Sequence, residues 1–293
     1  MSKPRVKGTR IGILCLVLWL AVRSAAAAPL PLPPDSVTYF PVVVRGEANE
    51  KKGLAWSWIG RDRDAWQDYQ ITWYYHWSTR PVAGVAAEFV PMLWSDWPSL
   101  KEQILRDVSR EYCGFLLVAN EPEFTTQADM TIEDLIALID WVAVMYPCAK
   151  IVAPQTHVCW YELYPPVPPC PVLGNERFTV EGFIRAYQAT HEGANPPIYA
   201  WGLHYGDVRY WPERLAGLMR QLTVPERFWY TEWNFCPDNL PRFEEWLIAL
   251  NQDERVQRYA YWTNLQETDY CVLAEFATGL PNERGRVYAG FGQ

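Results

Sequence analysis

Apolar runs of five to seven residues recur along the chain from residue 54 onward, and stretches with helical periodicity separate most of them. The runs predict eight strands, at Leu54–Ile59, Ile71–Trp77, Glu88–Leu93, Gly114–Ala119, Lys150–Pro154, Ile198–His204, Arg227–Trp233 and Arg258–Thr263. Helices are predicted at Ser99–Arg110, Thr131–Tyr146, Thr179–His191, Pro212–Gln221 and Pro241–Leu250. In the second of these helices, Glu133 is expected as the N3 partner of a capping pattern. Helices between the first three strands are short or weak.

Strands that alternate with amphipathic helices favour a parallel sheet of the α/β class. Eight such repeats within about 250 residues indicate closure into a single (β/α)₈ (TIM) barrel, which we place at residues 42–293. An open doubly wound sheet is the alternative fold. No glycine-rich turn follows an early strand, so the nucleotide-binding form of that alternative has no support.

The N-terminal residues have the pattern of an export signal. Basic residues precede the apolar run Ile11–Val22, and Ala25–Ala28 offers a small-residue cleavage region. We therefore expect a signal peptide at residues 1–28, a proline-rich leader at 29–41, and a secreted, extracellular protein. The alternative is a permanent anchor, but the apolar run is shorter than the roughly 20 residues that span a bilayer. Stable membrane insertion after cleavage is not expected.

Composition narrows the class of ligand. The whole chain has a formal net charge of −8, and removal of the signal takes away five positive charges and no negative ones. Because surfaces that bind nucleic acid are basic, such a partner is not expected. Aromatic residues make up 15% of the chain, with 16 Trp. This density exceeds what core filling needs and indicates surfaces that stack on flat ligands.

Six cysteines remain once Cys15 leaves with the signal, and an even number outside the cytosol favours disulfides. Cys113 and Cys148 each precede a neighbouring strand at the bottom of the expected barrel. The other expected pairs are Cys159 with Cys170, which close a proline-rich loop, and Cys236 with Cys271, which follow the last two strands. Reactive or metal-binding cysteines are the alternative, although no CxxC spacing occurs.

Two predicted strands end on a carboxylate. Glu121 follows the apolar run of the fourth strand, and Glu232 closes an aromatic run in the seventh. The top ends of the strands form the active-site floor of a (β/α)₈ barrel, so both carboxyl groups can converge on one bond. Paired carboxyl groups about 5 to 5.5 Å apart are the catalytic groups of a retaining glycosidase. Solvated turn residues are the alternative interpretation.

The motifs Asn120-Glu121-Pro122 and Thr231-Glu232-Trp233 resemble those of the clan A glycoside hydrolases. The wider chain is similar to the glycosyl hydrolase catalytic core related to glycoside hydrolase family 128, the endo-β-1,3-glucanases, over about Gly53–Asn264. Its strand motifs occur in the same order, at Gly53–Trp58, Trp73–Trp77, Glu88–Trp94, Phe115–Pro122 and Phe228–Trp233.

The resemblance implies roles for individual residues. Glu121 would be the acid/base and hold its proton near neutral pH, and Glu232 would be the ionised nucleophile. Asn120 would bind the substrate 2-hydroxyl, while His204 and Tyr205 would orient or donate to Glu232. A buried core histidine is the alternative for His204. Three departures from the family pattern occur: Glu123 replaces the usual Asp, the segment His204-Tyr205-Gly206 is one residue shorter, and the loop Cys159–Cys170 has no counterpart.

Nine tryptophans lie at or just past predicted strand ends, and we expect about half of them to contact sugar rings through their apolar faces. They are Trp56, Trp58, Trp77, Trp94, Trp97, Trp160, Trp201, Trp233 and Trp262. Trp94, Trp201 and Trp233 are the expected sugar contacts.

The sequence therefore predicts a retaining glycoside hydrolase that cleaves β-glucan, with β-1,3-glucan as the first candidate. We expect a monomer with a polysaccharide or oligosaccharide substrate and no cofactor. A glycan-binding barrel without turnover and a retaining glycosidase for another β-glycan are the alternatives. No metal site is expected, because His76, His157 and His204 lack a ligand spacing such as HExxH. A serine nucleophile lacks the GxSxG turn.

Overall fold

The computed structural model describes residues 49–56, 65–157, 178–204, 211–233, 240–263, 272–274 and 280–291. All of them belong to one unit, Arg45–Gln293. The expected signal peptide and proline-rich leader lie outside the described residues. Within these ranges, no helix combines the length and the apolar character needed to cross a membrane.

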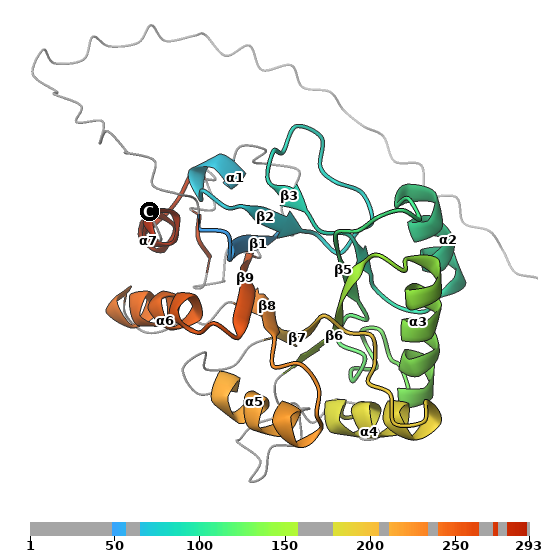
Figure 1. Ribbon diagram of the computed structural model, residues 1–293. Helices are drawn as coiled ribbons and strands as arrows, with labels where there is room; N and C mark the ends of the chain where they lie inside the picture. The colour runs from blue at the N-terminus through green and yellow to red at the C-terminus, as the bar shows by residue number, and fades with distance from the viewer. Residues whose placement is uncertain are drawn as a thin grey trace, which may run out of the picture. The chain divides into compact units, whose positions relative to one another are not determined.

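Nine parallel strands form one sheet, in the order β3-β2-β1-β9-β8-β7-β6-β5-β4. Their bounds are β1 Lys52–Trp56, β2 Trp73–Tyr75, β3 Glu88–Phe89, β4 Met92–Leu93, β5 Phe115–Val118, β6 Lys150–His157, β7 Ala200–His204, β8 Phe228–Trp233 and β9 Val256–Thr263. Each lies within a few residues of a predicted strand. In Figure 1 the strands form a ring at the centre with the helices outside it.

The two ends of this strand order meet in a single segment, which closes the barrel. β3 and β4 are separated only by Val90 and Pro91. On one side the Val90 N–H donates to Tyr74 O of β2, and on the other the Leu117 N–H of β5 donates to Pro91 O. The segment 88–93 therefore fills one strand position, and the eight positions confirm the predicted (β/α)₈ barrel.

Seven helices accompany the described strands, and five of them match the predicted ones. Their bounds are α1 Ala65–Asp68, α2 Pro98–Asp107, α3 Ile132–Met145, α4 Val180–Thr190, α5 Trp211–Gln221, α6 Leu240–Gln252 and α7 Glu283–Gly290. The expected capping residue of α3 is wrong: Thr131 is the N-cap, and its reciprocal partner at N3 is Asp134. Glu133 occupies the preceding position, where its side chain does not face the cap.

The interior of the barrel is packed and leaves the site at the carboxyl ends of the strands. Large aromatic residues such as Trp73 and Trp229 share this inner cluster with the small residues Ala55, Ala200 and Ala260. A second, larger cluster lies between the sheet and the helices. Large and small side chains interdigitate in both layers, so the barrel is a core rather than a pore.

One of the three expected disulfides lies in the described part of the chain and is confirmed. Cys113 and Cys148 are bonded just before β5 and β6, at the amino ends of the strands. The expected pairs Cys159 with Cys170 and Cys236 with Cys271 lie outside the described residues.

Candidate active site

Glu121 lies in a tight turn at the carboxyl end of β5. Ala119 and Glu121 have positive φ angles of 60° and 45°, which non-glycine residues rarely adopt. Hydrogen bonds hold this backbone: the Asn120 N–H donates to Trp94 O at 2.9 Å, and the Glu121 N–H to Gln155 O at 2.7 Å. Strain of this kind persists only where the surroundings fix it, and it clusters at functional sites.

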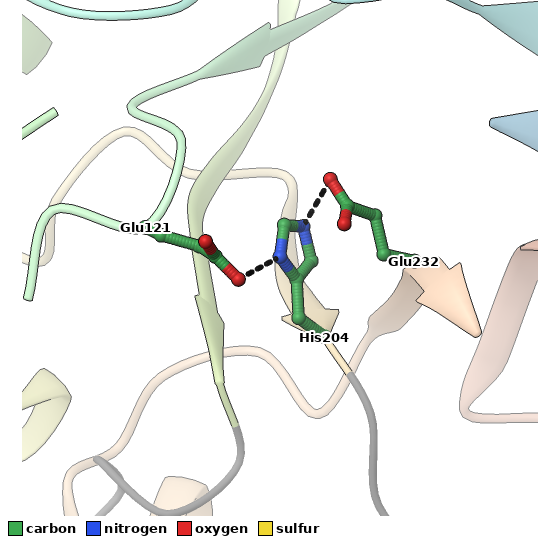
Figure 2. A group of neighbouring side chains, drawn as sticks. All are labelled: Glu121, His204 and Glu232. Atoms are coloured by element: carbon green, nitrogen blue, oxygen red, sulfur yellow. Dashed lines mark hydrogen bonds and ion pairs between the residues drawn. The ribbon is translucent and has the colours of Figure 1, made fainter. Parts of the chain in front are cut away.

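The ends of β7 and β8 bring His204 and Glu232 to the same place, because the two residues are register partners in neighbouring strands. Figure 2 shows the imidazole of His204 between the carboxyl groups of Glu121 and Glu232. Nδ1 lies 3.0 Å from Glu121 Oε1, and Nε2 lies 3.6 Å from Glu232 Oε1. His204 therefore lies against Glu121 as well as against Glu232, the partner expected from the sequence.

The two carboxyl groups lie close enough to act on one bond. One oxygen of Glu121, one oxygen of Glu232 and a ring nitrogen of His204 lie within 4.8 Å of one another. Retaining glycosidases place their carboxyl groups about 5 to 5.5 Å apart, whereas inverting enzymes leave roughly 6.5 to 9.5 Å for a water molecule. The separation fits the retaining arrangement.

Two donors from the region of β2 hold one oxygen of Glu232. Trp77 Nε1 donates to Oε1 at 2.9 Å, and Tyr75 Oη donates to the same atom at 3.2 Å. Both of these donors are bonded to Oε1, and among the described residues no donor is bonded to Oε2. From the sequence, Trp77 is named only among the tryptophans at strand ends and Tyr75 has no predicted role, although alternation with Trp73 points Tyr75 to the inner face of β2.

The charges of the carboxyl groups set the protonation of the site. Burial lowers the pKa of His204, but the negative charge of Glu232 and the hydrogen bond and charge of Glu121 outweigh it and raise the pKa to about 9. Burial raises the pKa of Glu232, while the charge of His204 and the bonds from Trp77 and Tyr75 act against this shift. At neutral pH the imidazolium cation of His204 stabilises the negative charge of the neighbouring carboxylates, which are almost fully buried.

A cavity of about 310 Å³ opens above the pair. Its lining residues are Trp77, Trp94, Asn120, Glu121, Gln127, Glu232 and Trp262. The structure thus places the expected residues Trp94 and Asn120 at the cavity. Asn120 Nδ2 donates to Gln127 Oε1 at 3.3 Å, and Asn120 Oδ1 has no hydrogen-bond partner among the described residues. Gln127 carries no sequence signal of its own, since it follows the turn in an irregular segment.

The glycosyl hydrolase catalytic core model matches residues 53–288 of this chain. The chain belongs to this family. Membership confirms the predicted class, glycoside hydrolase, and it covers every strand and helix described here apart from the first residue of β1 and the end of α7. No curated protein is significantly similar in sequence.

Solved structures of glycosyl hydrolase family 128 share the fold. An endo-β-1,3-glucanase of subgroup II from Pseudomonas viridiflava is 24% identical, with a TM-score of 0.60 over 82% of this chain and 97% of that one. A curdlan-specific exo-β-1,3-glucanase of subgroup III from Blastomyces gilchristii is 20% identical, with a TM-score of 0.60 over 82% and 98%. A subgroup I endo-β-1,3-glucanase from Amycolatopsis mediterranei is 21% identical, with a TM-score of 0.59 over 83% and 100%.

Two expected sugar contacts are wrong for this member of the glycosyl hydrolase catalytic core. Trp201 and Trp233 are fully buried in the cluster between sheet and helices. Trp201 Nε1 donates to Pro225 O, and the ring of Trp233 stacks on Phe243 with centroids 5.5 Å apart. Neither indole lines the cavity. Tyr205, the remaining expected residue, lies outside the described part of the chain.

Glu121, His204 and Glu232 also form the one group of three potential metal ligands found among the described residues. An imidazole offers a metal ion a single nitrogen, whereas here each of the two ring nitrogens faces a different carboxyl group. This arrangement matches proton sharing between the three side chains.

Proposed function

We propose that this protein is a retaining hydrolase of β-1,3-glucan that works by double displacement, with Glu121 as acid/base and Glu232 as nucleophile. The observation that carries the proposal is the pair of carboxyl groups within 4.8 Å at the floor of an indole-lined cavity. The substrate class is supported by the Amycolatopsis mediterranei relative, whose structure contains laminaritriose and laminaribiose.

In the first step, Glu232 Oε2 attacks the anomeric carbon while Glu121 gives its proton to the glycosidic oxygen. The bond to the leaving sugar breaks, and a glycosyl ester with Glu232 forms. In the second step, Glu121, now a carboxylate, takes a proton from water as the water attacks the anomeric carbon and releases Glu232. Two inversions give overall retention of configuration.

His204 supplies the proton that Glu121 needs. In the free enzyme the proton resides on the imidazole, because two carboxylates flank it. When substrate displaces water from the cavity, the proton moves across the 3.0 Å contact from Nδ1 to Glu121 Oε1. Glu121 is then an acid, the imidazole is neutral, and Glu232 keeps its charge through Trp77 and Tyr75.

The cavity offers partners for both faces of a sugar. Asn120 Oδ1 accepts a hydrogen bond from the substrate 2-hydroxyl, an interaction that strengthens as the transition state becomes oxocarbenium-like. Trp94, Trp77 and Trp262 cover the apolar C–H faces of the rings.

We also propose that the protein is exported through residues 1–28 and acts outside the cell as a monomer. The charge pattern and the short apolar run of this segment support export. N-terminal sequencing of the protein from culture medium is expected to find a new terminus near Ala28, and light scattering is expected to give the mass of one chain. A retained Met1 or a dimer mass would contradict these two statements.

The test is hydrolysis of β-1,3-glucan followed in real time by proton NMR of the new reducing ends. The β-anomer is expected first, with the α-anomer appearing by mutarotation; an initial α-anomer would contradict retention. Mixed-linkage glucan, cellulose, xylan and mannan are run beside it to test the substrate class. Product lengths separate endo action from exo action, both of which occur on this fold.

Glu232→Ala is expected to lower kcat by about 10⁴-fold or more while leaving glucan binding largely intact. The matched control is Glu133→Ala, because Glu133 is an exposed carboxylate on α3. Wild-type rates in Glu232→Ala would refute the nucleophile. Binding by the wild-type protein without any turnover would favour the rival glycan-binding barrel.

A further inference from the structure

Glu123 is a buried carboxyl group that the double-displacement mechanism does not use. It follows the acid/base by two residues, and its side chain has no solvent exposure. Oε1 accepts the backbone N–H of His157 at 2.7 Å. Oε2 has no hydrogen-bond partner in the described part of the chain. No Lys or Arg there forms a salt bridge with Glu123, so a negative charge at this position would be buried without a fixed cation.

Three titratable groups surround it. Glu121 comes from the same turn, His204 from the end of β7 and His157 from the end of β6. Burial raises the pKa of Glu123 to about 8; two backbone N–H groups and the charge of His204 oppose the shift, and the charge of Glu121 adds to it. Burial, with the charge of His204, lowers the pKa of His157 to about 4. At neutral pH both Glu123 and His157 are therefore uncharged.

The contacts of Glu123 indicate that it helps to hold the turn that carries Glu121. The turn that carries Glu121 is strained, with positive φ at Ala119 and Glu121. Three hydrogen bonds fasten it to β6. Two are main-chain bonds, from the Gln155 N–H to Ala119 O and from the Glu121 N–H to Gln155 O, and in the third the Glu123 side chain accepts the His157 N–H. Removal of the Glu123 side-chain bond leaves the turn of the proposed acid/base held to β6 by main-chain bonds alone.

We propose that Glu123 is a positioning residue that works in its uncharged form: it holds the turn of Glu121 against the end of β6 and keeps a further negative charge away from Glu121, His204 and Glu232. The inference rests on the proposed function, because the residue acts through the proposed acid/base. Once Glu123 loses its proton, the new buried anion repels Glu121 and draws the turn toward solvent. Activity then falls at alkaline pH.

Two substitutions of Glu123 distinguish the effect of its side-chain length from the effect of its charge. Glu123→Gln keeps the length and the acceptor for the His157 N–H but is uncharged at every pH. It is expected to retain neutral-pH activity within about threefold, and the alkaline limb of its kcat/KM profile should move from about pH 8 toward the pKa of His204, about 9. Glu123→Asp keeps the acid but is one methylene short of His157. It is expected to lose about tenfold in kcat with little change in KM.

The relative activities of the Gln and Asp variants test the proposal. A Gln variant that is less active than the Asp variant would mean that the charged form is needed, and it would overturn the proposal. An alkaline limb that is the same in wild type and Glu123→Gln would overturn it too. Thermal unfolding of each variant shows whether a loss of rate is only a loss of folded protein.

A readout that needs no turnover keeps this inference separate from the proposed function. Infrared difference spectra between wild type and Glu123→Gln are expected to show the carbonyl stretch of a protonated carboxylic acid at neutral pH, which disappears as the pH rises through about 8. If the acid band is absent, the inference fails even when glucan is hydrolysed. If the band is present and no β-1,3-glucan is cleaved, the substrate proposal fails and the uncharged Glu123 stands.

Discussion

Glu232 has a carboxyl group that is only 6% exposed, and three side chains favour its charged form. Trp77 and Tyr75 donate hydrogen bonds to Oε1, and His204 places a positive charge beside the same atom. A buried charge without such partners would take up a proton instead. The proposed role of Glu232 as nucleophile therefore depends on these donors.

Trp77→Phe tests this statement, because it removes the N–H and keeps an aromatic ring at the cavity wall. A hydrogen bond to a charged group contributes about 1.5 to 3 kcal/mol, and about 1.4 kcal/mol corresponds to a tenfold change in rate. We expect kcat/KM to fall about 10- to 100-fold, with most of the loss in kcat. The control is Trp94→Phe at the same cavity, which should raise KM and spare kcat. Equal effects of both variants would contradict the role of the Trp77 donor.

The protonation of His204 links the site to stability. Its folded pKa of about 9 lies above the ordinary value of 6.5, so its contribution to stability is fully present below pH 6.5 and is lost as pH rises through 9. Glu123 acts in the same direction over a lower range: its pKa is raised from 4.5 to about 8, so its contribution is fully present below pH 4.5 and is lost as pH rises through 8. Urea unfolding of wild type is therefore expected to show falling stability between pH 6.5 and 9. His204→Gln should show a shallower fall, and an unchanged slope would contradict the assigned charge.

The sequence predicts individual site residues where strand position decides their role. Glu121, His204 and Glu232 follow from the rule that polar strand ends face the barrel mouth. The same alternation excludes Trp201, because Gly202 and His204 point into the barrel and their neighbours point outward. Tyr75 is different: its bond to Glu232 crosses the barrel between strands that are not neighbours, and no local pattern encodes it.

At the level of the elements, a side chain from β6 reaches across β7 to β8. Gln155 is fully buried, and its Oε1 accepts the Thr231 hydroxyl at 2.6 Å. The backbone of Gln155 also receives the Glu121 N–H. One residue thus connects the strand end that carries Glu121 with the neighbour of Glu232. It can do so because Gly202 of β7 has no side chain: a Cβ there would overlap the Gln155 amide.

Gly202→Ala is expected to lower the free energy of unfolding by about 1 to 3 kcal/mol, the usual cost of overpacking a filled interior. It should also reduce kcat, because the displaced Gln155 loses Thr231. Gln155→Ala in the same chain makes room for the new methyl group. The double variant is therefore expected to be more stable than the sum of the single effects, which denaturant titration of all four proteins will measure. Strict additivity would show that Gly202 and Gln155 do not interact.

Periodicity predicts the elements themselves well and their ends less well. All eight strand positions lie where apolar runs occur, because buried parallel strands need continuous apolar sequence. The expected third strand is divided into β3 and β4 at Val90 and Pro91, since proline has no N–H for the ladder. The cap of α3 uses Asp134 rather than Glu133, a choice that depends on which residue is the N-cap.

The two ends of the barrel differ in what they carry: the candidate active site lies at the carboxyl ends of the strands, and stabilising contacts lie at the amino ends. The carboxyl ends of the strands carry strained backbone, buried carboxyl groups and the cavity. The amino ends carry structural contacts: Arg258 lies over the rings of Phe115 and Trp229 and forms an ion pair with Glu88. Sequence spacing predicts this division, since eight strands with helical crossovers must all point the same way.

The Cys113–Cys148 disulfide tests this separation, because it joins the amino ends of β5 and β6, whose other ends carry Glu121 and Gln155. The two cysteines are 35 residues apart, and closure of a loop of that length is expected to contribute about 3 to 4 kcal/mol through the unfolded state. Replacing both with serine should lower the midpoint of thermal unfolding and leave kcat and KM on glucan unchanged at moderate temperature. Both half-cystines are exposed, so two serines there leave no buried polar group unsatisfied. A fall in kcat at a temperature where the variant is fully folded would mean that the amino end of the barrel positions the acid/base, and the separation would not hold.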